Sequence, residues 1–125
     1  MDGLTIAEAA ATTGWSARML RYIEDAGLVA PQRSASGYRL YGPEQLQRLR
    51  TLRELLQEFD IGLSEMGFAR RLRTEEPLRT SVEEWLAATP ARPVHVDASD
   101  WLRWEQDKHE KLLATAPAVP EEHNR

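Results

Sequence analysis

Two short amphipathic segments separated by a glycine constrain this chain more than any other feature of its sequence. Thr5 and Glu8 have the spacing of a capping box, so a helix is predicted to begin there. Gly14 then interrupts the apolar stripe, and glycine can adopt the positive φ that a tight turn between helices requires. Ser16 is a favoured N-cap residue and predicts a second helix that ends at about Ala26. Two helices joined by such a turn are typical of a helix-turn-helix.

The next segment predicts a short β-hairpin over about residues 33–41. A Ser-Ala-Ser-Gly cluster is typical of a turn, and the Tyr-Arg-Leu-Tyr that follows it alternates as a strand does. A hairpin at this place would form a wing beside the second helix. Pro43 suits the first position of a new helix, which the leucine spacing extends over about residues 43–58. Another short helix is expected from about residue 61, and Gly67 is expected to interrupt it.

Charge and patterning change beyond residue 73. Residues 1–73 hold ten arginines and nine acidic residues, whereas residues 74–125 hold six basic and eleven acidic residues. The front part therefore has a net charge of +1 and the rest a net charge of −5. Apolar spacing predicts one helix over about residues 78–88 and a last helix over about residues 97–115, with prolines between them.

These patterns predict a mainly α fold, a winged helix-turn-helix with a short two-stranded wing and additional C-terminal helices. The expected organisation has three parts: a winged helix-turn-helix DNA-binding domain over residues 1–73, a helical self-association or partner region over residues 74–116, and a disordered tail over residues 117–125.

Composition excludes several classes of protein. The chain has no cysteine, which removes disulfides and thiolate metal sites. No signal peptide or apolar stretch of about 18 residues is visible, so we expect a cytoplasmic protein without membrane contact. His95, His109 and His123 lack metal-ligand spacing and are expected at the surface. No nucleophile elbow is present, so neither catalysis nor a cofactor is expected.

The helix-turn-helix suggests which side chains would meet DNA. A helix of this length fits the major groove with its N-terminal side chains nearest the bases. The candidates are Ser16, Ala17, Arg18 and Arg21. In the wing, Tyr38 and Arg39 would anchor the sugar-phosphate backbone. Alternatively, the arginines are ordinary solvated charges, and Tyr41 serves hairpin packing.

Specific residues in this region resemble those of the mercury-resistance regulator (MerR) family. The matching positions are Leu4-Thr5-Ile6-Ala7-Glu8-Ala9-Ala10, Thr13-Gly14, Ser16, Arg18, Leu20-Arg21-Tyr22, Glu24, Gly27-Leu28-Val29, Pro31, Arg33, Gly37-Tyr38-Arg39-Leu40-Tyr41, Leu46, Leu49 and Leu63-Ser64-Glu65. The resemblance covers about residues 4–72. The combination of Leu-Arg-Tyr-x-Glu with Gly-Tyr-Arg-x-Tyr at this separation is specific.

The resemblance implies a homodimer on a pseudo-palindromic promoter, where members of the family bend and untwist the DNA between the polymerase-recognition elements. RNA polymerase is therefore a further expected partner. Carried over by position, Arg18 is a groove contact, Tyr22 and Arg39 are backbone anchors, and Tyr38 is a wing contact. Arg21 contacts DNA or pairs with Glu24 or Asp25. The complete expected DNA-binding set is Ser16, Ala17, Arg18, Arg21, Tyr22, Arg33, Tyr38 and Arg39.

The chain departs from the family pattern at several places. Ile23 stands where the family usually has a second aromatic residue, and Trp15 replaces a small aliphatic one. Pro77, Pro90 and Pro93 fragment a region in which the family usually has one long helix that pairs with its dimer mate.

Two groups of residues leave alternatives open. Trp85, Trp101, Trp104 and Leu112 could form a dimer or partner face, a ligand pocket or a small core. The cluster of Arg48, Arg50 and Arg53 is expected to form a solvated helix face rather than a DNA patch. Two other functions compete with transcription regulation: an excisionase-like architectural DNA-binding protein, and a winged-helix interaction module that does not bind DNA.

Overall fold

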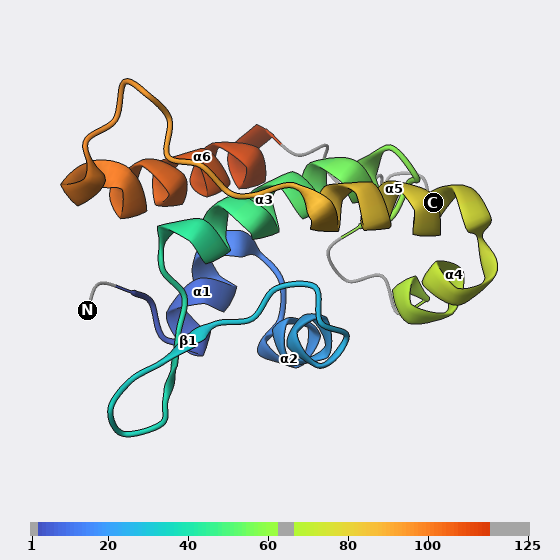
Figure 1. The fold of residues 1–125 in the computed structure, drawn as a ribbon, viewed down its shortest axis with the longest axis horizontal. Coiled ribbons are helices and arrows are strands. Elements are labelled where there is room, and N and C mark those ends of the chain that lie inside the picture. The colour runs from blue at the N-terminus through green and yellow to red at the C-terminus, as the bar shows by residue number, and fades with distance from the viewer. Residues whose placement is uncertain (1–2, 63–66, 116–125) are drawn as a thin grey trace, which may run out of the picture.

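The described part of the chain is mainly helical, with one short hairpin after its second helix (Figure 1). The computed structural model describes residues 3–62 and 67–115. The elements are α1 (Ile6–Thr13), α2 (Ala17–Asp25), β1 (Gln32–Arg33), β2 (Arg39–Leu40), α3 (Pro43–Gln57), α4 (Phe68–Thr74), α5 (Glu76–Ala87), the 3-10 helix η1 (Ala98–Asp100) and α6 (Trp101–Thr115). The predicted fold class, a winged helix-turn-helix with additional C-terminal helices, is confirmed.

Local interactions form the helix-turn-helix as the sequence predicts. The Thr5 amide donates to Glu8 Oε1 at 2.9 Å and the Glu8 amide donates to Thr5 Oγ1 at 3.1 Å, which completes the capping box. Gly14 has a φ of 87°, in the left-handed region that favours glycine. Ser16 Oγ then accepts a hydrogen bond from the Met19 amide at 3.0 Å and caps α2.

The wing is a two-stranded antiparallel hairpin whose base is fixed by the start of the chain. Gln32 pairs with Leu40, and Arg33 pairs with Arg39. Leu4 and Tyr41 exchange two backbone hydrogen bonds of 2.8 Å, so the segment before α1 lies beside the end of β2. The base of the wing is therefore held by the pairing of its own two strands and by the segment before α1.

Helix α3 runs through the middle of the molecule and carries the core (Figure 1). Its apolar stripe is fully covered, because Leu46, Leu49, Leu52 and Leu56 are each at most 1% exposed. Helices α1, α5 and α6 all pack against α3, and α6 also packs against α1. In Figure 1, α2 and the wing lie on the opposite side of α3 from α6.

The segments after α3 differ in detail from the predicted pattern. Gly67 is the N-cap of α4. Pro77 lies in the first turn of α5, where a missing amide donor is tolerated, so α5 begins slightly earlier than predicted. Residues 63–66, part of the expected fourth helix, and the predicted disordered tail lie outside the described residues.

One apolar core extends across the predicted domain boundary at residue 73. Leu78 and Val82 of α5 belong to the same cluster of buried residues as Leu20 and Ile23 of α2. Leu78 is 0% exposed, whereas Leu86 on the same helix is 43% exposed. Helix α5 therefore contributes buried residues to the core of the winged helix, and Leu102 of α6 packs against that core.

Replacing Leu78 with alanine should lower the free energy of unfolding by about 2–5 kcal/mol, because the change leaves a cavity in the shared core. Chemical denaturation followed by far-UV circular dichroism measures this change, and unfolding should remain a single transition. Leu86→Ala is the matched control and should change stability by less than about 0.5 kcal/mol. A separate transition for α5 and α6 in the Leu78 variant would contradict a common core.

Candidate nucleic-acid interface

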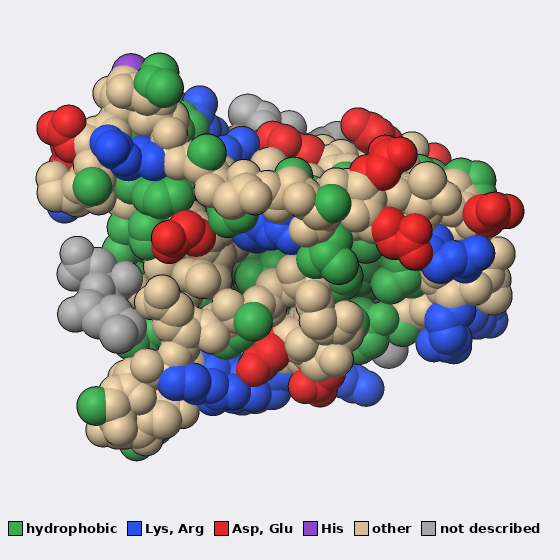
Figure 2. All heavy atoms as spheres, in the orientation of Figure 1, with side chains coloured by type: hydrophobic (Ala, Val, Ile, Leu, Met, Phe, Trp, Pro, Cys, Tyr) green, Lys and Arg blue, Asp and Glu red, His purple; other side chains and the backbone are tan. Residues whose placement is uncertain are grey.

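Helix α2 has one buried face and one charged face. Leu20 and Ile23 are 1% and 0% exposed, whereas Arg18 and Arg21 are exposed. Neither guanidinium forms a hydrogen bond or ion pair within residues 3–62 and 67–115. In Figure 2, Lys and Arg side chains gather along the lower edge, where Figure 1 places α2. This face of α2 therefore carries two exposed guanidinium groups that have no partner among the described residues.

The first residues of α2 lie at the same surface. Ser16 is exposed, but its hydroxyl caps the helix and is already used as an acceptor. Ala17 is half-buried and presents only a methyl group. Ser16, Ala17 and Arg18 thus lie at the N-terminal end of α2, where a helix in a major groove approaches the bases, and Arg21 lies one turn further along.

Tyr22 joins α2 to a further basic residue. Its ring contacts Phe68 of α4 edge to face, with centroids 6.0 Å apart. Burial raises the pKa of the Tyr22 hydroxyl, and the nearby positive charge of Arg73 acts in the opposite direction. Arg73 is exposed on α4, so it adds a cation beside Tyr22 that the sequence analysis did not include. The run of Arg70, Arg71 and Arg73 was the signal in the sequence.

Glu24 of α2 binds both strands of the wing. Its Oε2 atom lies 2.9 Å from Arg33 Nη2, and its Oε1 atom lies 2.7 Å from Arg39 Nε. The hydrogen bond from Arg39 is the main reason why the pKa of the Glu24 carboxyl is lowered. Among the described residues Arg21 forms an ion pair with neither Glu24 nor Asp25, so the alternative of a pair within the helix is wrong. The two wing arginines are fixed against α2.

The two wing tyrosines have different surroundings. Tyr38 is 72% exposed, and its amide donates to Ser34 Oγ at 3.1 Å. Tyr41 is 1% exposed and belongs to the core, as the packing interpretation predicts. Tyr38 is therefore the aromatic side chain that the wing presents to a neighbouring molecule.

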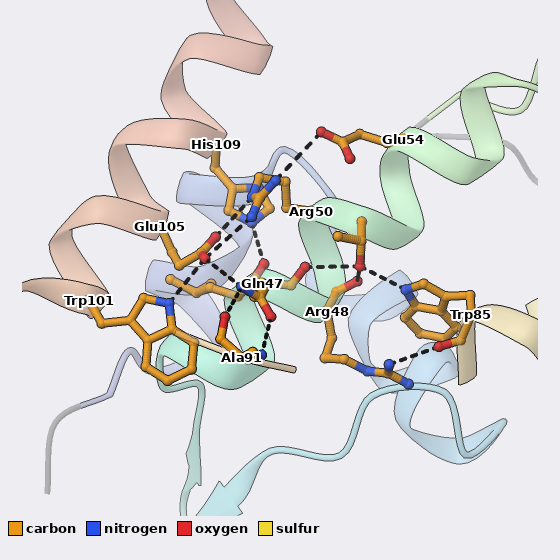
Figure 3. Close-up of polar contacts among 11 residues, drawn as sticks. Gln47, Arg48, Arg50, Glu54, Trp85, Ala91, Trp101, Glu105 and His109 are labelled. Carbon is orange, nitrogen blue, oxygen red and sulfur yellow. Dashed lines mark hydrogen bonds and ion pairs between the residues drawn. The ribbon is translucent and has the colours of Figure 1, made fainter. Parts of the chain in front are cut away.

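The tryptophans of the C-terminal helices pack against their own chain (Figure 3). Trp85 is 9% exposed, and its Nε1 atom donates to Thr51 Oγ1 at 2.8 Å. Trp101 is also 9% exposed and donates to Glu105 at 3.2 Å. Trp104 and Leu112 are half-buried. These contacts leave little of Trp85 and Trp101 exposed to a partner.

The expectation that the arginines of α3 form a solvated face is wrong. Arg48 stacks over the Trp85 ring at 4.0 Å and donates to the Trp85 and Ala88 carbonyls at 2.9 and 2.8 Å. Arg50 binds the fully buried carboxylate of Glu105, with Nε and Oε1 2.9 Å apart. Arg53 is only 4% exposed. All three bind the C-terminal half of the chain, which the local sequence pattern does not reveal.

Two further polar contacts attach α6 and the loop before it (Figure 3). The Gln47 amide group forms two hydrogen bonds with the backbone of Ala91, of 2.7 and 2.8 Å. The Nε2 atom of His109 lies 2.7 Å from the Leu46 carbonyl oxygen. His109 is 0% exposed, so the expectation of a surface position is wrong for this residue.

Two other kinds of feature, metal sites and membrane-spanning helices, are absent from the described part of the chain. Within it, no group of three or more His, Asp or Glu side chains could hold a metal ion. None of its helices combines the length and the apolar character needed to cross a membrane.

Comparison with known proteins identifies relatives of the chain. Residues 4–66 match the family model described as MerR HTH family regulatory protein. The HTH-type transcriptional regulator HmrR of Sinorhizobium medicae is 40% identical over 62 residues, which cover 49% of this chain and 40% of that protein. Heavy metal-dependent transcription regulator 2 of Rhizobium meliloti aligns with the same identity and coverage.

A longer alignment links the chain to a Haemophilus influenzae protein described as a probable heavy metal-dependent transcriptional regulator. The two are 35% identical over 82 residues, which cover 65% of this chain and 62% of that protein. The chain thus spans less than two thirds of the length of these relatives. No solved structure matches the chain.

Replacing Glu24 with glutamine should loosen the wing, because the two arginines lose the charge that fixes them against α2. Hydrogen exchange of the Ser34 and Gly37 amides, both hydrogen-bonded within the wing, should become faster. The free energy of unfolding should change by less than about 1 kcal/mol, since the pairs are partly exposed. Asp25→Asn, at the exposed end of the same helix, should leave the wing amides unchanged. We call the pairing of Glu24 with Arg33 and Arg39 the Glu24 clamp. Equal exchange rates in the Glu24 variant and the wild type would show that this clamp does not hold the wing.

Stability should also depend on the protonation of His109. Burial is the main cause that lowers the pKa of this imidazole, and the charges of Arg50 and Arg53 act in the same direction. The hydrogen bond with the Leu46 carbonyl and the charge of Glu105 act in the opposite direction. Near and below the ordinary histidine pKa of about 6.5, the folded state therefore binds fewer protons than the unfolded state. The stability that neutral His109 contributes is fully present above that pKa and is lost as the pH falls below it. Urea denaturation between about pH 7 and about pH 5.5 should show this loss.

His109→Gln retains a donor for the Leu46 carbonyl and should flatten that pH dependence. His95→Gln changes an exposed histidine and should leave it as in the wild type. A pH dependence that is identical in all three proteins would show that His109 is not responsible.

Proposed function

The chain belongs to the MerR family of helix-turn-helix regulatory proteins, and we propose that it binds promoter DNA in a sequence-specific manner and regulates transcription. In this proposal α2 is the recognition helix and enters the major groove. The wing, residues 32–40, lies on the adjoining sugar-phosphate backbone.

The observation that carries the proposal is the outer face of α2. Arg18 and Arg21 are exposed and form no ion pair within the described residues, although acidic residues are abundant in the chain. A planar guanidinium can form two hydrogen bonds with guanine O6 and N7, the commonest specific contact in the major groove. An exposed helix with two such side chains is suited to that role.

The remaining residues of the set divide between base and backbone contacts. Ser16 and Ala17 lie at the end of α2 that approaches the base edges. Tyr22, Arg33, Tyr38 and Arg39 would contact the backbone. Because one Glu24 carboxylate neutralises only one of its two arginines, the clamp keeps a net positive charge. It thus supplies attraction to phosphate as well as a fixed wing position.

The distribution of charge is consistent with this orientation. In Figure 2, Asp and Glu side chains are more frequent along the upper edge, over α5 and α6, than over α2 and the wing. The exposed acidic residues of these two helices include Glu83 and Glu84 of α5 and Asp107 and Glu110 of α6. The acidic half would therefore face away from the DNA, where it causes the least repulsion.

We further propose that two copies bind a pseudo-palindromic operator in the cytoplasm and act on RNA polymerase at the promoter, as the family resemblance implies. A symmetric dimer would place two α2 helices in major grooves about one helical turn, ~34 Å, apart. The metal dependence in the names of the relatives is not carried over. Residues 4–66, which hold the match, contain neither cysteine nor histidine.

Two measurements separate this function from its rivals. A winged-helix interaction module would show almost no binding to a random duplex at low salt, whereas the exposed arginines predict binding that weakens steeply as salt is added. An excisionase-like architectural protein would bind DNA but leave transcription from a reporter promoter unchanged.

Arg18→Ala should weaken binding to a duplex selected from a random library by about 1–3 kcal/mol and relax the base preference at one position. Fluorescence anisotropy at fixed salt measures the affinity. Arg103→Ala is the matched control, because it removes an exposed arginine from α6 and should change the affinity little. Equal losses in the two variants would show that only total charge matters and would remove Arg18 from the site.

A further inference from the structure

Arg53 of α3 is a buried cation without a carboxylate partner among the described residues. Its side chain is 4% exposed, and its Nε atom has no hydrogen-bond partner in this part of the chain. Burial lowers the pKa of its guanidinium, but arginine stays charged in proteins. A charge that is buried without compensation is strongly destabilising, so this position needs a source of negative potential.

The ends of two helices supply that potential. Arg53 Nη1 lies 3.5 Å from the carbonyl oxygen of Thr13, the last residue of α1. Arg53 Nη2 lies 3.4 Å from the carbonyl oxygen of Leu112, in the last turn of α6. These distances are at the long end of hydrogen bonding, so attraction between the cation and the negative ends of both helices is the main contribution.

Thr13 connects this cation directly to the turn that precedes α2. The Thr13 side chain is fully buried; its hydroxyl donates to the Ala9 carbonyl at 2.8 Å and accepts from the Trp15 amide at 3.3 Å. Gly14, Trp15 and the N-cap Ser16 then lead into α2. A continuous set of contacts thus runs from the end of α6 through Arg53 and Thr13 to the start of the recognition helix.

We propose that Arg53 is a positioning residue through which the docking of α6 on α1 and α3 sets the orientation of α2, and hence the affinity for DNA. The inference rests on the proposed function and extends it. It involves α6, which lies outside the family-matched residues 4–66. The dependence arises because Arg53 binds both helix ends at once, so an undocked α6 leaves it free to turn away from Thr13.

The docking of α6 can be weakened at a contact in which Arg53 takes no part. Glu105 is buried and binds Arg50 and Trp101 (Figure 3), so Glu105→Gln removes the charge that holds α6 against α3. Glu110→Gln, at an exposed position of the same helix, is the control. Arg53→Met removes the cation but keeps an unbranched side chain, and Arg53→Lys keeps the charge without the planar fork.

We would measure two quantities in each variant and in the Arg53→Met, Glu105→Gln double variant. The first is the hydrogen exchange of residues 14–20 without DNA, and the second is the affinity for the selected duplex. Glu105→Gln alone should speed exchange in residues 14–20 and weaken binding by about fivefold or more. With Met at position 53, Glu105→Gln should have no further effect on either measurement. The exchange rates and the affinity of Arg53→Lys should lie between those of the wild type and those of Arg53→Met. If Arg53→Met does not fold, Arg53→Lys is used in its place.

Unchanged exchange in residues 14–20 upon Arg53 substitution would overturn the proposal, as would additive effects of the two substitutions. A residue that only stabilises the fold would instead raise exchange evenly in α1, α3 and α6 and leave the affinity of the folded molecules unchanged. If the wild type binds no duplex, the proposed function fails, but the exchange measurement still decides whether α6 acts on the turn through Arg53.

Discussion

The burial of α3 on two sides is the constraint on which the rest of the structure depends. One side carries the leucine stripe, which packs against the helix-turn-helix and α5. The other side carries Gln47, Arg48 and Arg50, which bind the backbone and side chains of the C-terminal segments. Because a single helix organises both halves, the orientation of α2 relative to the wing and the position of α6 have a common reference.

Local patterns in the sequence were sufficient for the DNA-facing half. The capping box at Thr5, the turn at Gly14 and the N-cap at Ser16 are interactions between residues at most four positions apart, so their spacing reveals them directly. The wing followed from its turn cluster. The helices of residues 74–115 were also located to within a few residues, since proline and apolar spacing are local features as well.

The contacts between distant segments could not be predicted in the same way. Arg48, Arg50 and His109 resemble surface residues of amphipathic helices until a partner that is 37 to 63 positions away covers them. The partners of Arg48 and His109 are backbone carbonyls, which every residue possesses and which therefore leave no signature in the sequence. The pairing of Glu24 with both wing arginines had the same limitation, because Glu24 and Asp25 lie three and four residues after Arg21 and suggested a simpler pair within the helix.

The arginines of α2, the wing and α3 divide into two groups with different tasks. Those of α3 are enclosed by carbonyl groups, a carboxylate and a tryptophan ring, and they hold the molecule together. Those of α2 are exposed, and those of the wing share one carboxylate. Arginine is suited to both tasks because its weakly hydrated, planar cation tolerates burial and also forms paired hydrogen bonds.

The contact between Gln47 and Ala91 has a consequence for how freely the loop before α6 can change. At Ala91, whose side chain is exposed, the glutamine amide binds only the main-chain N–H and C=O. Its Nε2 atom also donates to Glu105 Oε2 at 3.4 Å. Any residue other than proline can offer the same two groups. Side-chain identity at position 91 is therefore nearly unconstrained, whereas the length of the loop is fixed, because an insertion or deletion would move the main chain out of register with Gln47. We therefore expect related sequences to keep the length of this loop while the residue at position 91 varies.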